Sequence, residues 1–93
     1  MVEDFEQDDF DMLDPSAKQV LVALSEFDKG VLVKVDLLHR KTGLMPEGLN
    51  DALRHLSKAQ LIDILDTPKR MGPYEFYAVE ITDFGREVLA KFG

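Results

Sequence analysis

One run of residues, Met45 to Ile62 (MPEGLNDALRHLSKAQLI), constrains the fold of this chain more than any other. Within it, Leu49, Leu53 and Leu56 recur at the spacing of one helical face, and polar residues occupy the other faces. Pro46 suits the first position of a helix, because its missing N–H would be unpaired there anyway. A shorter helix-like run precedes this stretch and a β-branched run follows it. The order predicts two helices joined by a tight turn and followed by a strand.

Charge is distributed unevenly along the chain. The net charge is −7, yet seven of the 18 acids lie in the segment 1–14, which contains no base, so the remainder is neutral with 11 acids and 11 bases. Such a segment repels itself and has too few apolar residues to build a core. We therefore expect an acidic, partly disordered N-terminal tail over 1–14 and one domain over 15–93.

The tail also contains apolar residues that a purely solubilising segment does not need. Acids alternate with aromatic and apolar side chains from Phe5 to Leu13, and residues 8–13 resemble the acidic–aromatic segments of transcription activators. Three interpretations stay open. The tail packs Phe10 or Leu13 onto the domain, it binds a protein partner through Phe5–Leu13, or it is disordered.

Several classes of function find no support in the composition. With 93 residues there is room for a single core but not for a deep cleft, and the absence of cysteine excludes disulfides and thiolate chemistry. The chain has no long apolar run and no secretory signal, so we expect a cytoplasmic protein without membrane contacts. His39 and His55 are interpreted as surface residues rather than as a metal site. No nucleophile or phosphate-binding motif is present, so neither an enzyme nor a cofactor is expected.

The other elements follow from the same rules of periodicity and punctuation. Asp14 is predicted to cap a helix through its side-chain oxygen, Gly43 to form the tight turn, and Thr82 to cap the last helix. Val35, Leu37 and Leu38 are predicted to face inward. The expected elements are a helix over 15–27, a strand at 31–33, helices over 34–42 and 46–59, strands over 61–66 and 74–81, and a helix over 82–92.

This order, α-β-α-α-β-β-α, predicts an α+β winged helix-turn-helix fold with a small antiparallel sheet. The chain resembles the winged-helix domains of MarR- and PadR-type prokaryotic regulators in three places. These are Thr42-Gly43-Leu44, the leucines leading into Leu61-Ile62, and Ile81-Thr82-Asp83-Phe84-Gly85-Arg86. These families usually have glycine where Gln60 stands. Glutamine costs roughly 1 kcal/mol there if the left-handed conformation is kept; otherwise the turn has another shape.

The resemblance implies a sequence-specific regulator that binds double-stranded DNA. The helix over 46–59 would lie in the major groove, and the loop over 67–73 would form a wing on the flanking backbone. Asn50 would read adenine and Arg54 guanine, and the remaining basic side chains would hold phosphates. A homodimer suits two half-sites, with its surface built from Leu65, Tyr77, Val79 and Phe92. The candidate DNA-binding residues are Lys34, Arg40, Lys41, Asn50, Asp51, Arg54, His55, Lys58, Lys69 and Arg70.

Two acids, Glu47 and Asp51, lie on the same helix and weaken this interpretation. From Lys34 to Arg70 there are seven bases and five acids, so the expected reading surface is only mildly positive. The alternative is a winged-helix module that binds protein without reading DNA. For the tail, we expect electrostatic competition with DNA for Arg40, Lys41, Lys69 and Arg70, so that deleting residues 1–13 would raise affinity at low salt.

Overall fold

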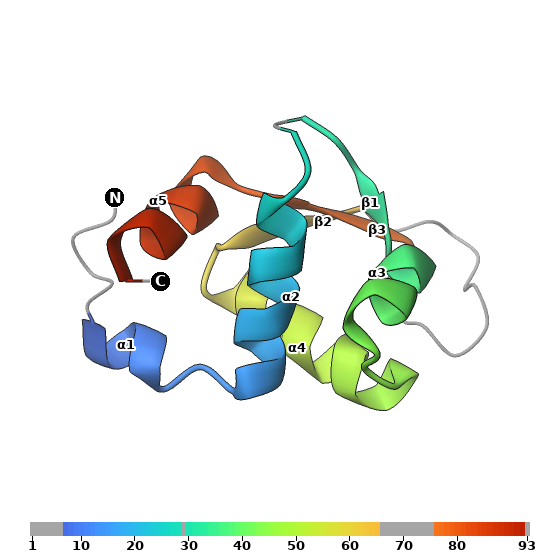
Figure 1. The fold of residues 1–93 in the computed structure, drawn as a ribbon, viewed down its shortest axis with the longest axis horizontal. Coiled ribbons are helices and arrows are strands. Elements are labelled where there is room, and N and C mark those ends of the chain that lie inside the picture. The colour runs from blue at the N-terminus through green and yellow to red at the C-terminus, as the bar shows by residue number, and fades with distance from the viewer. Residues whose placement is uncertain (1–6, 29, 66–75, 93) are drawn as a thin grey trace.

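The computed structural model describes residues 7–28, 30–65 and 76–92 (Figure 1). In these ranges the chain is α+β, with five helices and a three-stranded antiparallel sheet, an arrangement compatible with a winged-helix-like fold. The elements are α1 (Gln7–Asp11), α2 (Pro15–Ser25), β1 (Val33–Lys34), α3 (Val35–Thr42), α4 (Pro46–Lys58), β2 (Ile62–Leu65), β3 (Ala78–Ile81) and α5 (Asp83–Phe92).

The sheet brings together three segments that are distant in the sequence. Its strand order is β1-β3-β2, and both pairings are antiparallel. Val79 of the central strand pairs with Val33 on one side and with Ile64 on the other. The central strand therefore fixes α3, which follows β1 directly, relative to α4, which leads into β2.

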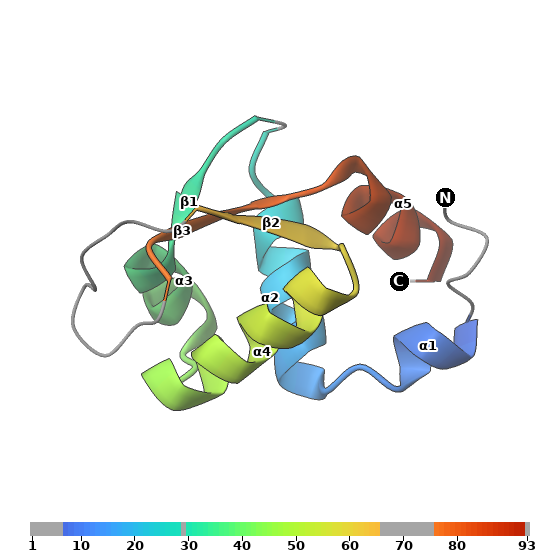
Figure 2. The same ribbon diagram turned by 180° about the vertical axis from the view of Figure 1, so that it is seen from behind.

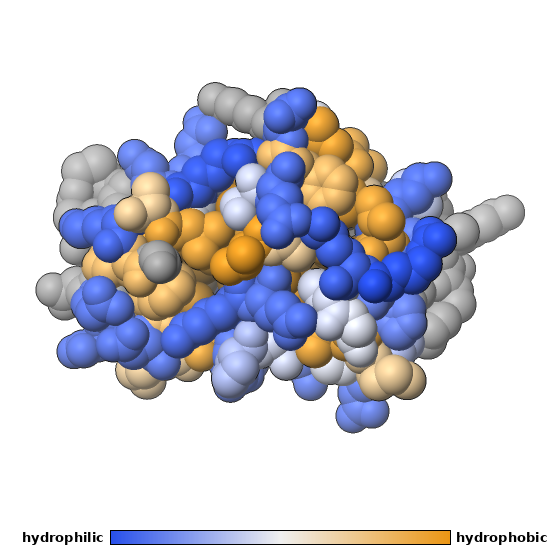
Figure 3. Space-filling model, viewed as in Figure 1, coloured by the Kyte–Doolittle hydropathy of each residue, from blue (hydrophilic) through white to orange (hydrophobic). Residues whose placement is uncertain are grey.

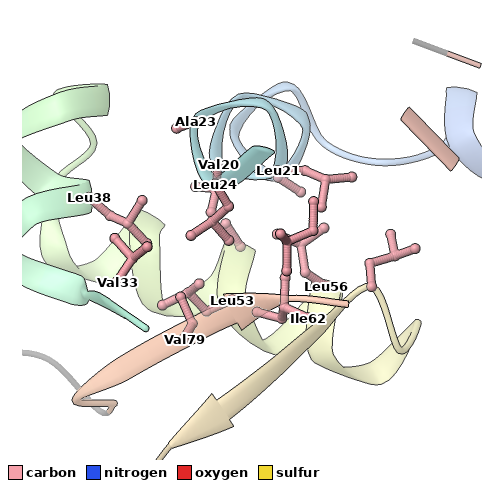
Figure 4. Packing of buried hydrophobic residues seen from close by; sticks show 14 of the residues in the cluster. Val20, Leu21, Ala23, Leu24, Val33, Leu38, Leu53, Leu56, Ile62 and Val79 are labelled. Atoms are coloured by element: carbon pink, nitrogen blue, oxygen red, sulfur yellow. The ribbon is translucent and has the colours of Figure 1, made fainter. Parts of the chain in front are cut away.

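The core lies between the sheet and the two long helices α2 and α4 (Figure 4). Leu24 of α2, Leu53 of α4 and Val79 of β3 are almost fully buried and point into the same layer. Each fully buried aliphatic side chain contributes about 1.5–3 kcal/mol relative to an exposed one. The predicted inward positions are thus confirmed for Leu49, Leu53 and Leu56 of α4 and for Val35 and Leu38 of α3. The predicted inward position of Leu37 is wrong, because its side chain is 38% exposed.

The turn between α3 and α4 is closed by side chains as well as by backbone. Gly43 forms the predicted turn, and it does so in the left-handed conformation with a φ of 76°. Thr42 Oγ1 donates to the carbonyl of Leu38 at 2.7 Å and accepts from the amide of Leu44 at 3.2 Å. Nδ1 of His39 donates to the carbonyl of Leu44. These bonds fix the angle at which α4 leaves the turn, so His39 has a local structural role.

Gln60 keeps the left-handed conformation that glycine usually provides, with a φ of 64°. Its carbonyl accepts a hydrogen bond from Thr82 Oγ1 at 3.0 Å, and the amide of Thr82 donates to the carbonyl of Leu61 at 3.1 Å. Thr82 Oγ1 also accepts from the amide of Gly85 at 2.9 Å, which confirms the predicted cap of α5. The turn after α4 and the start of α5 therefore form one bonded unit.

Several predicted boundaries differ from the structure. The first long helix ends at Ser25 rather than Phe27, and β1 comprises Val33 and Lys34, whereas Val31 and Leu32 are exposed. The side chain of Asp14 makes no capping hydrogen bond at the start of α2. The ends of short strands depend on the geometry of the adjoining loops, which a periodic sequence pattern does not indicate. The predicted strand residues at 66, 74 and 75 lie outside the described ranges.

The N-terminal segment forms a further short helix, α1, which the sequence did not predict. Phe10 is buried, and its ring centroid lies 6.0 Å from that of Phe92 on α5. The ammonium of Lys18 lies 5.0 Å from the centroid of the Phe10 ring. Apolar side chains gather between α1, α2 and α5 (Figure 3). For residues 7–14, the structure thus has the packed arrangement among the three that the sequence left open.

Candidate nucleic-acid interface

Helix α4 has one buried side and one solvent-exposed side. Helix α4 lies against α2 and β2 (Figure 2), and its buried residues face them, so its outer side points away from α2. The helical spacing i, i+4, i+7, i+11 places Glu47, Asp51, Arg54 and Lys58 in one stripe, and all four are exposed. We call these four residues the outer stripe. The buried residues of α4 are Leu49, Asn50, Ala52, Leu53 and Leu56.

Asn50 does not lie on the outer stripe. It is only 6% exposed, so the prediction that it faces outward to read adenine is wrong. The reason is geometric, because each helical residue turns by about 100° and Asn50 lies next to Leu49 and one turn before Leu53. The apolar spacing of α4 defined a face, but it did not fix how far around the helix the core extends.

The charges on the outer stripe change sign along the helix. Glu47 and Asp51 occupy its N-terminal half, and Arg54 and Lys58 occupy its C-terminal half. Nη2 of Arg54 donates to Oδ1 of Asp51 in an i, i+3 ion pair, with 47% and 56% of the two side chains exposed. The formal charge of the stripe is therefore zero, and its one arginine is held by a neighbouring acid.

His55 lies beside the outer stripe and faces the N-terminal segment. Its Nδ1 is 3.6 Å from Oδ2 of Asp14, the residue that precedes α2. This pair explains where the Asp14 carboxylate goes instead of capping α2. No local sequence pattern indicates this pair, because the two residues are 41 positions apart and belong to separate elements.

The basic residues of α3 are also engaged with acids of the same chain. Arg40 Nη2 lies 3.6 Å from Asp36 Oδ2 on the same helix. Lys41 Nζ lies 2.6 Å from Glu26 Oε1, at the end of α2, and 5.7 Å from the centroid of the Phe27 ring. Lys41 is therefore directed toward α2, whereas the outer side of α4 points away from it. The structure does not bring these two candidate groups together on one surface.

The remaining candidates lie near the sheet or outside the described ranges. Lys34 is exposed at the start of α3, and its ammonium lies 5.9 Å from the centroid of the Tyr77 ring. Lys69 and Arg70, with the whole predicted wing over 67–73, fall outside the residues that the structure describes. The candidate residues within the described ranges therefore lie on α3, on α4 and at the start of the sheet.

The N-terminal tail was expected to compete with DNA for Arg40 and Lys41. Residues 7–14 of the tail do not cover these two side chains. In both views α1 lies next to α5 on one side of α2, and α3 lies on the other (Figures 1 and 2). Asp14, at the end of this segment, contacts α4 through its pair with His55. Residues 1–6 lie outside the described ranges.

Two of the residues expected at a dimer surface pack against other residues of the same chain. Val79 is fully buried in the core, so its proposed exposure is wrong. Phe92 is half-buried beside Phe10. Leu65 remains 43% exposed, and Tyr77 lies below the ammonium of Lys34. The period-2 pattern of β3 suggested two faces, but Ala78 and Val79 are both buried.

Within residues 7–28, 30–65 and 76–92, no group of three or more His, Cys, Asp or Glu side chains is placed to hold a metal ion. No helix in the same ranges is long and apolar enough to cross a membrane.

Comparison with known proteins supports the fold. No protein-family model matches the chain, and no curated protein matches it. The structure is similar to that titled "Crystal structure of RV1404 from Mycobacterium tuberculosis", with a TM-score of 0.67 and 23% sequence identity. The match covers 88% of this chain and 52% of that one, so the chain spans about half the length of RV1404. At this identity the similarity concerns the fold alone.

Proposed function

We propose that this chain is a sequence-specific DNA-binding transcriptional regulator with a winged helix-turn-helix fold of the MarR/PadR type. One observation carries the proposal. Helix α4 follows a left-handed turn at Gly43, packs one side against α2 and the sheet, and presents its other side, the outer stripe, to solvent. A helix in this position is the element that a helix-turn-helix protein places in the major groove.

The proposed contacts follow from the exposed side chains. Arg54 donates to base edges from the middle of α4, and Lys58 binds a phosphate from its last turn. Lys34 holds a flanking phosphate near the sheet. The predicted wing, with Lys69 and Arg70, would lie on the adjacent backbone. A single domain of this size buries about 600–1,000 Å² of its surface on DNA, so two half-sites and a homodimer belong to the proposal.

The ion pairs of the candidate bases reduce non-specific attraction without preventing binding. Among the described candidates, Arg40, Lys41, Arg54 and His55 each lie within 4 Å of an acid of the same chain. Exposed pairs of this kind are worth about 0–1 kcal/mol, so a phosphate can replace the acid at little cost. The expected binding is therefore weak on arbitrary DNA and depends on the sequence of the site.

A fluorescence-anisotropy titration with a labelled duplex of mixed sequence tests the proposal. We expect binding at micromolar protein that weakens from about 50 to 200 mM salt. Lys58→Ala should weaken binding and lower the salt slope by about 1, since one phosphate contact is lost. Lys91→Ala is the matched control, because it removes the same charge from the exposed end of α5. The absence of salt-dependent binding by folded protein would refute the proposal.

A second candidate function is recognition of a protein through the N-terminal end of α4. Glu47 and Asp51 are exposed there, and Met45 just before the helix is 68% exposed. Acids around an exposed methionine suit a basic, apolar protein surface better than a phosphate backbone. If the duplex titration fails, this is the function to pursue. Substituting Met45 and Glu47 should then weaken capture of a basic partner and leave the fold intact.

A further inference from the structure

We infer that the Asp51–Arg54 pair of α4 is the specificity-determining element of the interface, and that it directs binding to G·C base pairs. The inference rests on the proposed DNA-binding function and names the kind of sequence that the site reads. Only side chains on the exposed side of α4 can reach a base. Within the outer stripe, Asp51 and Arg54 occupy the middle of the helix and are joined to each other.

The burial of Asn50 removes the side chain best suited to adenine. Asparagine reads adenine through bidentate bonds to N6 and N7, which require an outward amide. At 6% exposure, the Asn50 amide cannot make both bonds without turning α4 out of the core. The exposed polar side chains of α4 that remain are acids and bases, and Ser57 is half-buried.

The chemistry of the remaining pair matches the major-groove edge of a G·C pair. Guanine presents two acceptors, O6 and N7, to a guanidinium, and cytosine presents the N4 amino donor to a carboxylate. Arg54 supplies the guanidinium and Asp51 the carboxylate, one turn apart on one exposed side. An adenine N6 amino group would oppose the donors of Arg54, and thymine offers no donor to Asp51.

The ion pair also makes the contact selective. Asp51 holds the guanidinium over the helix surface, which reduces the rotamer entropy lost when Arg54 binds guanine. The same carboxylate repels phosphates, so a wrong sequence gains little from the charge of Arg54. Non-specific binding is lowered more than specific binding, and the ratio between them rises.

The experiment selects duplexes from a pool with a randomised central segment and then measures affinity on the selected duplex. Single G·C to A·T changes are made at each selected position. For the native protein, one or more positions should show a loss of about 5- to 150-fold, the value of one bidentate contact. Arg54→Met removes the donors that bind guanine O6 and N7, which a lysine would retain, so this loss should shrink to about twofold or less at the same position.

Three further variants separate readout from general electrostatics. Asp51→Asn should raise affinity for the unselected pool and reduce discrimination on the selected duplex. Asp63→Asn, the same change on exposed β2, should leave discrimination unchanged. Lys91→Met is the control for Arg54→Met, because it removes the same charge from the exposed end of α5, outside the proposed interface. Circular dichroism confirms that each variant is folded.

The outcomes distinguish this inference from the proposed function. Binding with no G·C preference, or with a preference that Arg54→Met leaves intact, overturns the role of the pair while DNA binding stands. No binding of the randomised pool by the folded native protein overturns both. A preference that disappears in Arg54→Met and persists in Lys91→Met supports the inference.

Discussion

Arg86 of α5 donates a 2.7 Å hydrogen bond from Nη2 to the backbone carbonyl of Phe27, 59 residues earlier in the chain. Its Nη1 donates to the carbonyl of Ser25, the last residue of α2, at 3.3 Å. The last carbonyls of a helix have no partner within it, and a cation near them also offsets the helix dipole. Arg86 thus joins the end of α2 to α5 and helps to hold the layer on which α4 packs.

Replacing Arg86 should therefore destabilise the whole fold. Arg86→Met retains much of the apolar stem but removes the donors, so we expect a loss of about 1.5–3 kcal/mol in the free energy of unfolding. Arg86→Lys should recover only part of it, because one ammonium cannot match the fork. Urea denaturation followed by circular dichroism measures both. Equal stability of Arg86→Met and the native protein would contradict the structural role.

Two glycines should respond to alanine in opposite directions. A Cβ on Gly85 would lie near the carbonyl oxygen of Leu61 and Cγ1 of Ile81, at a separation from the latter of 2.9 Å. Gly85→Ala should therefore cost about 1–3 kcal/mol, because α5 must move away from the turn after α4. Gly48 lies inside α4, and a Cβ there meets nothing within 4 Å among the described residues. Gly48→Ala should stabilise by about 0.5–1 kcal/mol. Thermal unfolding of the two variants tests the pair, and a shift in the same direction would count against it.

Gln60→Gly should also stabilise the chain. Gln60 has a φ of 64°, a conformation that disfavours side chains other than glycine. Relief of this strain should contribute about 1 kcal/mol, which corresponds to about 4–8 °C in the midpoint of thermal unfolding for a domain of this size. Gln60→Ala is the control, because alanine keeps the strain and should give no such increase. A higher midpoint for the alanine variant than for the glycine variant would disprove the explanation.

The sequence predicted those parts of the fold that depend on local patterns. Leucine spacing located α4, Gly43 located the turn, and Thr82 located the cap of α5, because each signal acts within a few residues. The N-terminal segment was harder, since α1 depends on Phe10 packing against Phe92 at the far end of the chain. A five-residue helix has almost no intrinsic stability, and it is too short for its sequence to show a periodic pattern.

The candidate site was less predictable than the fold. Exposure of Arg54 and Lys58 follows from the helical period, whereas the burial of Asn50 depends on how closely the neighbouring elements wrap α4. The acids beside Lys41 and His55 come from α2 and from the residue before it, so only the tertiary arrangement shows them. The net charge of a surface therefore depends on pairs that a count of bases along the chain misses.

The contact between Phe10 and Phe92 should anchor the N-terminal segment. Phe10 is buried, so Phe10→Ala removes the transfer free energy of one aromatic side chain, about 1.5–3 kcal/mol. Phe10→Ala should then accelerate hydrogen exchange on α1 and α5 more than on α4, because the lost packing is confined to the end of the molecule where α1 lies. Met12→Ala is the control, since Met12 is 81% exposed and its truncation should change neither quantity. Unchanged exchange in Phe10→Ala would show that this contact does not anchor the segment.

The acids of the N-terminal segment should weaken DNA binding through charge rather than through direct cover of α3. Deleting residues 1–13 would also remove Phe10 from its contact with Phe92, so a substitution that keeps the contact is the sharper test. Asp8, Asp9 and Asp11 are exposed on α1, and changing all three to asparagine removes three negative charges. We expect higher affinity for a mixed-sequence duplex at about 50 mM salt and a smaller difference at about 200 mM, because added salt screens charges beyond a Debye length. Equal affinity at the lower salt concentration would refute this role, and a circular dichroism spectrum unchanged from the native one would exclude misfolding as the cause.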